Sequence, residues 1–427
     1  MLETIKNAWK ILDLRKKILF TLFIVVIFRI GSVMPVPFIN PDELANSISS
    51  GDNTFFSYLS ILTGGGLQYG AIFAMGVTPY INSSIIMQLL TVAIPYLERL
   101  SKEGEEGQKK IAKYTRFATV ILGLIQGIAF FFYLSNTGML SVTGTGAKWF
   151  AGFVIVLALT AGSALVMWLG EQIDEKGIGN GISILLFAGI LSRAPDAFWA
   201  LVSWWKADQQ FAVIAIVVVF LLVIAFIVWM SNAERRLPVQ YAKRVVGRKM
   251  YGGQSSHIPI KVNMSGVMPI IFASSILMIP TMILSFWSSE ANWFHKILQL
   301  FSTQGVFYAV LYFALIIAFA YFYVTIQYNP VEMANNLRKN SGSIPGIRPG
   351  QPTSDFIQKV LSRVTLIGAL CLSVVAVGPI LFALFSDAFK NISVGGTSVL
   401  IIVGVALEIV NNLESQMMMR HYKGFLD

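Results

Sequence analysis

The stretch FAVIAIVVVFLLVIAFIVWMS, from Phe211 to Ser231, decides the class of fold. It contains no charged residue, and its only hydroxyl-bearing residue is the last one. An α-helix needs about 20 consecutive apolar residues to cross the hydrocarbon core of a bilayer. This stretch therefore predicts a transmembrane helix.

Similar runs recur along the whole chain. Hydrophobic residues make up 55% of the sequence and charged residues only 13%, whereas soluble domains carry about 25% charged residues. We therefore expect an all-α membrane protein with ten transmembrane helices, of which the second and fifth fit the pattern least well. The predicted spans are 18–36, 70–97, 114–134, 150–170, 180–200, 211–231, 264–287, 305–326, 361–385 and 397–417.

The positive charges alternate between the loops and predict the orientation. If the amino terminus is inside, 26 of the 32 Lys and Arg residues fall in inner segments and five in outer loops, while Arg29 lies within the first span. Positive charge stays on the cytoplasmic side, so both termini are predicted there. A basic stretch before an apolar run also begins secretory signals, but the run ends at Gly31–Pro35 without a small-residue cleavage site.

Two inner loops, 232–263 and 327–360, are long and basic. Connections between helices usually take 2 to 8 residues, so this length indicates docking of a partner. The charges could also serve only to fix orientation. A basic surface of this kind suits RNA phosphates, anionic lipid or an acidic protein, and composition does not choose among them.

Catalytic chemistry is scarce within the predicted spans. Arg29 and Glu408 are the main ionisable residues there, and Arg29 is expected to snorkel or to pair. The three histidines lie in loops or the tail, and Cys371 is the only cysteine, so we expect no metal site, cofactor or disulfide. The run Gly177–Gly181 lacks the Lys-Ser or Lys-Thr of a phosphate loop and predicts a tight turn or close helix packing.

A short apolar stub precedes the second span. Residues 55–62 are too few to cross lipid, and three glycines, Gly64, Gly65 and Gly66, follow them. The stub could be an interfacial helix, or it could fold back into the bundle as a movable stopper with a glycine hinge. Amide and hydroxyl side chains within the spans could form weak contacts between helices that must separate.

Several long motifs resemble the SecY family, the channel subunits of the bacterial Sec protein translocase. The motifs are GVTPYINSSIIMQLL from Gly76, WLGEQI from Trp168 running into GIGNGIS from Gly177, PGIRPG from Pro345 and GGTS from Gly395. The resemblance extends from the first predicted span to the last. It implies two pseudo-symmetric five-helix halves arranged as a clamshell around a pore, with a short plug helix.

The resemblance implies a role for each segment and for particular residues. A cytoplasmic segment 1–17 precedes the amino-terminal half 18–200, which holds the plug at 55–66, and the carboxy-terminal half 201–417 precedes a cytoplasmic tail, 418–427. The pore ring would be Val77, Ile81, Ile182, Leu186, Ile271 and Ile401. The plug would comprise Phe55, Phe56, Tyr58, Leu59, Ile61, Leu62, Gly64, Gly65 and Gly66. Polar residues of a lateral gate would be Gln88, Gln126 and Asn263, and partner-docking residues would be Arg248, Lys249 and Arg348.

The resemblance also implies a function and partners. The chain would translocate unfolded polypeptides across the bacterial cytoplasmic (inner) membrane and release hydrophobic segments sideways into lipid, driven by the SecA motor ATPase or the ribosome. SecE and SecG subunits, signal peptides, nascent chains and membrane lipid would be the other partners. A secondary transporter for a small solute is the alternative, and an intramembrane enzyme is the weakest hypothesis because it would need a nucleophile, dyad or metal cluster.

Overall fold

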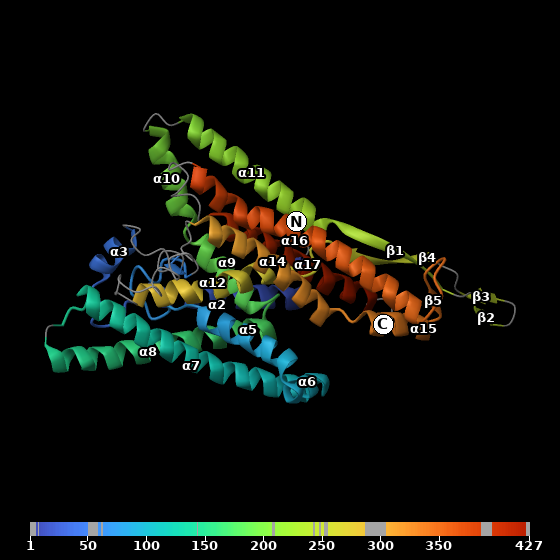
Figure 1. Cartoon of the computed structure of the whole chain (residues 1–427), viewed down its shortest axis with the longest axis horizontal. Coiled ribbons are helices and arrows are strands. Elements are labelled where there is room, and N and C mark those ends of the chain that lie inside the picture. Colours follow the sequence, from blue (N-terminus) through green and yellow to red (C-terminus); the bar gives the residue numbers. More distant parts are fainter. Residues whose placement is uncertain are drawn as a thin grey trace. The chain divides into compact units, whose positions relative to one another are not determined.

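The computed structural model describes residues 6, 8–49, 59–60, 63–142, 144–206, 210–241, 244–246, 249–251, 255–286, 305–385 and 395–423. Helices account for most of these residues (Figure 1). The helices are α2 (Leu12–Gly31), α3 (Pro41–Ser49), α5 (Thr78–Ala93), α6 (Pro95–Lys102), α7 (Glu105–Thr137), α8 (Thr145–Lys176), α9 (Gly181–Leu191), α10 (Ala194–Lys206), α11 (Gln210–Asn232), α12 (Met268–Phe286), α14 (Val306–Gln327), α15 (Pro330–Lys339), α16 (Gln351–Phe385) and α17 (Gly395–Lys423).

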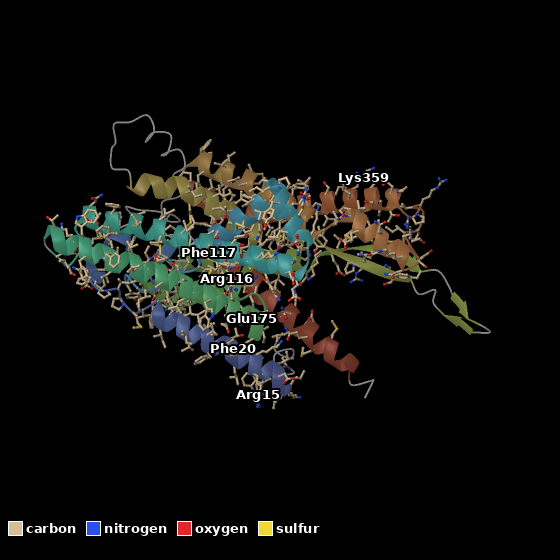
Figure 2. All side chains as sticks on the ribbon, turned by 90° about the horizontal axis from the view of Figure 1, so that it is seen from below. Arg15, Phe20, Arg116, Phe117, Glu175 and Lys359 are labelled. Atoms are coloured by element: carbon tan, nitrogen blue, oxygen red, sulfur yellow. The ribbon has the colours of Figure 1, made fainter. Side chains whose placement is uncertain are left out.

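Each of the ten predicted spans falls on a helix or on a pair of helices. Seven helical runs among the described residues are long and apolar enough to cross a membrane, and there are eight if α5 and α6 form one bent span. The outer faces of these helices carry exposed apolar side chains, as expected for contact with lipid. Phe117 on α7, for example, is 60% exposed (Figure 2).

The predicted second span, 70–97, differs from the structure at both ends. The helix begins only at Thr78 because Gly70 and Gly76 take positive φ angles, which interrupt a right-handed helix. It ends at Ala93, and α6 then turns by 100° from α5. Pro95 follows the break, and the residue before a proline disfavours the helical conformation.

The predicted fifth span, 180–200, is likewise divided. Helix α9 ends at Leu191, and α10 begins at Ala194, directly before Pro195. Ser192 and Arg193 stand between the two helices. The run Gly181–Lys206 still counts as one span, so this two-residue interruption does not bend the fifth span as the break between α5 and α6 bends the second.

The chain divides into two compact units. Unit 1 comprises Met1–Ile216, Ser275–Gly305 and Ile401–Asp427, and unit 2 comprises Val217–Ser274 and Val306–Leu400. The centre of unit 1 is the hairpin of α7 and α8, against which α5 and α2 pack. A cluster of buried apolar residues near one end of this hairpin joins it to the segment 36–75.

Small residues allow the helices of unit 1 to approach closely. Gly123 and Gly127 of α7 lie against Thr160 of α8, and Gly152 of α8 lies under the ring of Phe131. Small side chains at helix contacts are the usual way in which transmembrane helices pack, because van der Waals contact replaces the hydrophobic effect there. The hydroxyl of Ser83 on α5 adds an interhelical hydrogen bond, donated to the carbonyl oxygen of Thr115 on α7 at 2.8 Å.

Unit 2 contains β-structure that the sequence patterns did not predict. The first long inner loop forms strands β1 (Glu234–Tyr241), β2 (Arg244–Val246), β3 (Lys249–Tyr251) and β4 (Ser255–Lys261). Strand β1 pairs antiparallel with β4 and also with β5 (Gly342–Ser343) from the second long loop. The two loops therefore share one sheet, and β2 and β3 form a separate hairpin at its far end (Figure 1).

One face of this sheet is buried against helices of unit 2. Leu237 and Val239 alternate with exposed residues along β1, which is the period of a half-buried strand. Their side chains join Ile357 and Leu361 of α16 and Leu337 of α15 in one apolar cluster. The sheet is thus packed onto the first turns of α16, and α16 itself packs along α14.

Candidate functional site

The predicted pore-ring residues lie on four helices. Val77 caps the start of α5 and Ile81 follows one turn later, and both side chains are buried. Ile182 and Leu186 are likewise one turn apart on α9, where Leu186 is buried and Ile182 contacts Gly170 of α8. These four residues belong to unit 1.

The two remaining ring residues come from later helices. Ile401 is buried on α17 and belongs to unit 1, whereas Ile271 is buried on α12 and belongs to unit 2. The ring itself, which would bring all six side chains together, therefore stays a prediction. All six positions are aliphatic and none of them is exposed.

The glycine run before α9 fixes this helix against α8, as the tight-turn interpretation predicted. Gly179 takes a φ of +72°, and the backbone N–H of Gly181 donates to the carboxylate of Asp174 at 2.7 Å. A Cβ atom on Gly181 would overlap the carbonyl of Gly170, so only glycine permits this approach. Asn180 caps α9 by accepting a hydrogen bond from the N–H of Ser183.

Arg29 forms a hydrogen bond that anchors the glycine hinge. Its guanidinium Nη1 donates to the carbonyl oxygen of Gly64 at 3.2 Å. This contact confirms that Arg29 pairs, and its partner is a backbone group of the hinge. Gly64 itself takes a φ of +65° and lies so close to α9 that a Cβ atom there would be 2.6 Å from the carbonyl oxygen of Gly189.

Arg193 is a second anchor, which the sequence patterns did not identify. Between α9 and α10, its Nη1 donates to the hydroxyl of Ser60 at 3.4 Å and its Nη2 to the side-chain oxygen of Gln68 at 3.2 Å. Asp196 lies 4.0 Å from its Nε. Arg29 of α2 and Arg193 of the turn between α9 and α10 thus hold Ser60, Gly64 and Gln68, and we call this arrangement the arginine anchor.

The predicted plug is described only in part. Phe55, Phe56, Tyr58, Ile61 and Leu62 lie outside the described residues. Leu59 is 4% exposed and belongs to the apolar cluster at the end of the α7–α8 hairpin. Gly65 takes a φ of +87° and Gly66 is buried, so the glycines form the turn that carries the chain from the stub toward α5.

The predicted gate residues are half-buried and differ in their hydrogen bonds. Gln88 of α5 donates to the hydroxyl of Ser84 on the same helix at 3.3 Å. The buried side-chain oxygen of Asn263, just before α12, has no hydrogen-bond partner among the described residues. Gln126 lies midway along α7. The role of these residues in a gate stays a prediction.

An ion pair strengthens unit 1 beside the predicted ring helices. The Nε atom of Arg116 on α7 donates to the carboxylate of Glu171 on α8 at 2.7 Å. The Arg116 side chain is 52% exposed and the Glu171 side chain 20%, so solvent reaches the pair and its contribution to stability is modest. Among the described residues, no group of histidine, cysteine or acidic side chains could hold a metal ion.

Two of the three predicted docking residues are described, and both belong to the long inner loops but not to the three-stranded sheet β4-β1-β5. Arg348 is exposed in the turn before α16, and Lys249 begins β3. Arg248 lies outside the described residues. The alternation of apolar and polar residues in β1 was the signal that could have predicted this sheet.

Comparison with solved structures defines the class of protein. A structure described as a protein-conducting channel matches with a TM-score of 0.66 at 16% identity, covering 94% of this chain and 92% of that chain. The same coverage is found for a SecY structure whose plug domain stabilises the closed state, with a TM-score of 0.64 at 16% identity. Canine Sec61 in a ribosome–channel complex matches with a TM-score of 0.63 at 17% identity. The fold is that of the protein-conducting channels.

Sequence comparison defines the family. A profile of the SecY family matches residues 71–410. A Streptomyces coelicolor protein named protein translocase subunit SecY is 43% identical, and a Mycobacterium tuberculosis protein of the same name is 42% identical, each over the full length of both chains. This chain belongs to the SecY family. It is a multi-pass membrane protein and not an enzyme, and the comparisons give no support to a small-solute transporter.

Proposed function

We propose that this chain is the central channel subunit through which unfolded polypeptides cross the bacterial cytoplasmic membrane and from which hydrophobic segments enter the lipid. The observation that carries this proposal is the 43% identity over full length to a translocase subunit. The excess of Lys and Arg in alternate loops supports cytoplasmic amino and carboxy termini and ten spans.

The polypeptide path runs between two halves, 18–200 and 201–417, and is closed by the aliphatic ring. A collar of this type excludes ions by expelling water, because apolar side chains offer no group that replaces an ion's hydration. It can still yield to a peptide of any sequence, because no contact in it is directional. The burial of Val77, Ile81 and Leu186 supports their place in such a collar.

The plug, residues 55–66, seals the path on the outer side of the collar, and the arginine anchor holds it there. Arg193 donates to Ser60 within the stub, and Arg29 donates to Gly64, which follows the stub. Hydrogen bonds from a charged donor contribute about 1.5–3 kcal/mol each. This amount is enough to keep the resting plug in place and small enough for an entering chain to overcome.

A lateral gate opens between spans two and three on one side and seven and eight on the other. Gln88, Gln126 and Asn263 contribute polar contacts that close it. The unpartnered side-chain oxygen of Asn263 supports this role. A buried oxygen without a hydrogen bond destabilises the folded state, so a change at the gate that supplies a donor would be favoured. A signal sequence would then leave through the gate by partitioning into lipid.

The two long inner loops dock the SecA motor ATPase or the ribosome, with Arg248, Lys249 and Arg348 as the main contacts. A basic protrusion suits the phosphates of ribosomal RNA. The canine Sec61 structure is described as part of a ribosome–channel complex, which supports a ribosome as one partner. SecE and SecG are the expected small subunits, and signal peptides, nascent chains and lipid are the ligands.

Conductance in planar bilayers tests this function. We compare the wild-type chain with a deletion of residues 55–62, with Ile81→Gly and with Ile401→Gly. Ile227→Gly is the matched control, because Ile227 is a buried isoleucine of α11 outside the ring and outside the cluster that contains Leu59. We expect a tight wild type and control and ion leakage in the three pore variants. Equal tightness of all variants would disprove the pore assignment, and saturable flux of a small solute would favour a transporter.

A further inference from the structure

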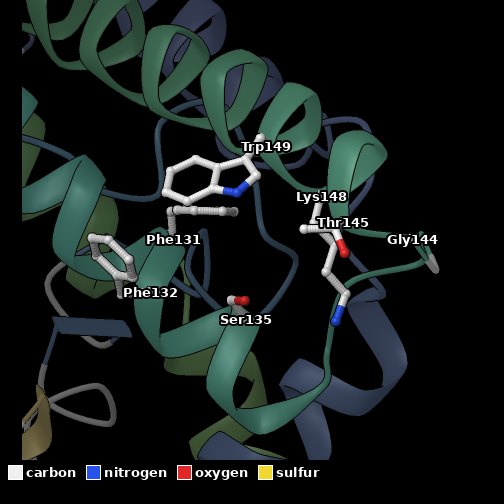
Figure 3. Close-up of a pocket in the computed structure, with 7 residues that line it drawn as sticks. All are labelled: Phe131, Phe132, Ser135, Gly144, Thr145, Lys148 and Trp149. Atoms are coloured by element: carbon white, nitrogen blue, oxygen red, sulfur yellow. The ribbon is translucent and has the colours of Figure 1, made fainter.

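A pocket lies where α7 and α8 meet, and no part of the proposed transport mechanism uses it. Its volume is about 370 Å³. Aromatic rings of Phe131, Phe132 and Trp149 line one side, and Thr145 and Lys148 line the other, with Ser135 between them (Figure 3). The last residue of the lining is Gly144.

The polar side of the pocket favours an anion. No carboxylate among the described residues lies within ion-pair distance of the Lys148 ammonium group, and no acidic residue lines the pocket. Gly144 is the N-cap of α8 and has no side chain to accept from the first N–H groups, and the first turn of α8 contains no acidic residue. The positive end of the helix dipole therefore adds to the charge of Lys148.

The position of the pocket points to a lipid. Helices α7 and α8 are both long and apolar enough to span the bilayer, so the end at which they meet lies at a membrane surface. Trp149, which lines the pocket, is 64% exposed, and the adjacent Phe150 and Phe153 one turn later are also exposed. Exposed aromatic residues at a helix end are typical of the level of the lipid headgroups.

We propose that this pocket binds the phosphate of an anionic phospholipid headgroup. The Lys148 ammonium pairs with the phosphate, the hydroxyls of Ser135 and Thr145 donate to its oxygens, and the N–H groups of the first turn of α8 point toward it. The rings of Phe131 and Trp149, whose centroids are 6.4 Å apart, cover the glycerol and the first methylene groups. The aromatic wall is the reason to assign a lipid and not a free phosphate ion. This proposal requires only that the hairpin spans the membrane and does not depend on the channel function.

Native mass spectrometry of the detergent-purified protein with added phosphatidylglycerol tests the proposal. We expect Lys148→Ala to reduce bound phosphatidylglycerol about fivefold, the effect of one lysine near an anionic surface, and Lys148→Arg to retain most of it. Lys206→Ala is the matched control, since Lys206 is an exposed lysine at the end of α10.

Three results would overturn the proposal. An equal loss in Lys148→Ala and Lys206→Ala would show general attraction to basic protein surface. If the wild-type protein retains phosphatidylcholine as well as phosphatidylglycerol, the pocket does not distinguish lipids by the charge of their headgroups. Displacement of the lipid by millimolar inorganic phosphate would show a site for a free anion. A Ser135→Ala variant that keeps the fold, as shown by gel filtration, should reduce phosphatidylglycerol binding in the same direction.

Discussion

Replacement of Gly64 by alanine isolates the contribution of the arginine anchor. Gly64 and its neighbour Gly65 both have positive φ angles, +65° and +87°, so either alanine would cost about 1–2 kcal/mol in backbone strain. Their surroundings differ. A Cβ atom on Gly64 would lie 2.6 Å from Arg29 Nη1, Gly189 O and Ser192 Oγ, whereas on Gly65 the nearest atom would be 3.6 Å away. Gly65→Ala is therefore a matched control for strain without crowding.

The crowding at Gly64 sets the size of the expected effect. To reach an ordinary separation of 3.4 Å from the backbone oxygen of Gly189, the alanine must move by about 0.8 Å. A shift of this size would stretch the bond from Arg29 to the Gly64 carbonyl, now 3.2 Å, beyond hydrogen-bonding distance. We expect Gly64→Ala to lose about 1–3 kcal/mol of stability more than Gly65→Ala, the usual cost of overpacking.

Two measurements check this prediction. Thermal unfolding in detergent should place the midpoint of Gly64→Ala below that of Gly65→Ala, and bilayer conductance should show a leak in Gly64→Ala that is larger than in the control. If the two variants unfold at the same temperature and are equally tight, then Gly64 is not crowded in the folded protein. In that case the anchor does not hold the plug segment.

Three further predictions concern other contacts. Gly181→Ala should lower the unfolding temperature and raise ion leakage in bilayers, because the added methyl group would displace α9 from Gly170. Gly146→Ala in α8 is the control and should change neither quantity, because its Cβ atom would meet no atom within 4 Å. Equal behaviour of the two variants would refute the close packing of α9 on α8. Arg193→Ala should cost about 1.5–3 kcal/mol and raise ion leakage, measured by unfolding and conductance, and an unchanged conductance would contradict its role in the anchor. Arg348→Glu should weaken the binding of ribosomes to vesicles that contain the protein, and Lys359→Glu, at an exposed position of α16, should weaken that binding less. An equal loss of binding in the two variants would show that only the net charge of the protein matters.

The seven helical runs that are long and apolar enough to cross a membrane were predictable from the sequence because each is a local property. A run such as 211–231 needs only its own composition to be recognised, and it falls on α11. The breaks in the second and fifth spans were visible as poor fits, but their positions depended on particular residues. Gly76 and Pro95 mark the ends of α5, and Pro195, the second residue of α10, follows the interruption between α9 and α10.

The contacts that hold the candidate site were harder to predict because they join distant segments. Arg29 was notable as a charge within a span, but nothing in the sequence showed that its partner is the carbonyl of Gly64, since every residue has a backbone carbonyl. The pairing of β1 with β5 joins two loops about 100 residues apart. The residues assigned to the ring, gate and docking surface came from the family resemblance, and they stay predictions.

The sheet packed on α16 has a mechanical consequence. Helix α16 contains 35 residues and is therefore about 52 Å long, whereas the hydrocarbon core is about 30 Å thick. The turns that hold the sheet can stand above the bilayer as a rigid continuation of a transmembrane helix. A partner that displaces the sheet would therefore also displace the part of α16 that lies in the membrane. A rigid helix would transmit a displacement of the sheet to the membrane-embedded turns, whereas a flexible loop of the same length would absorb that displacement.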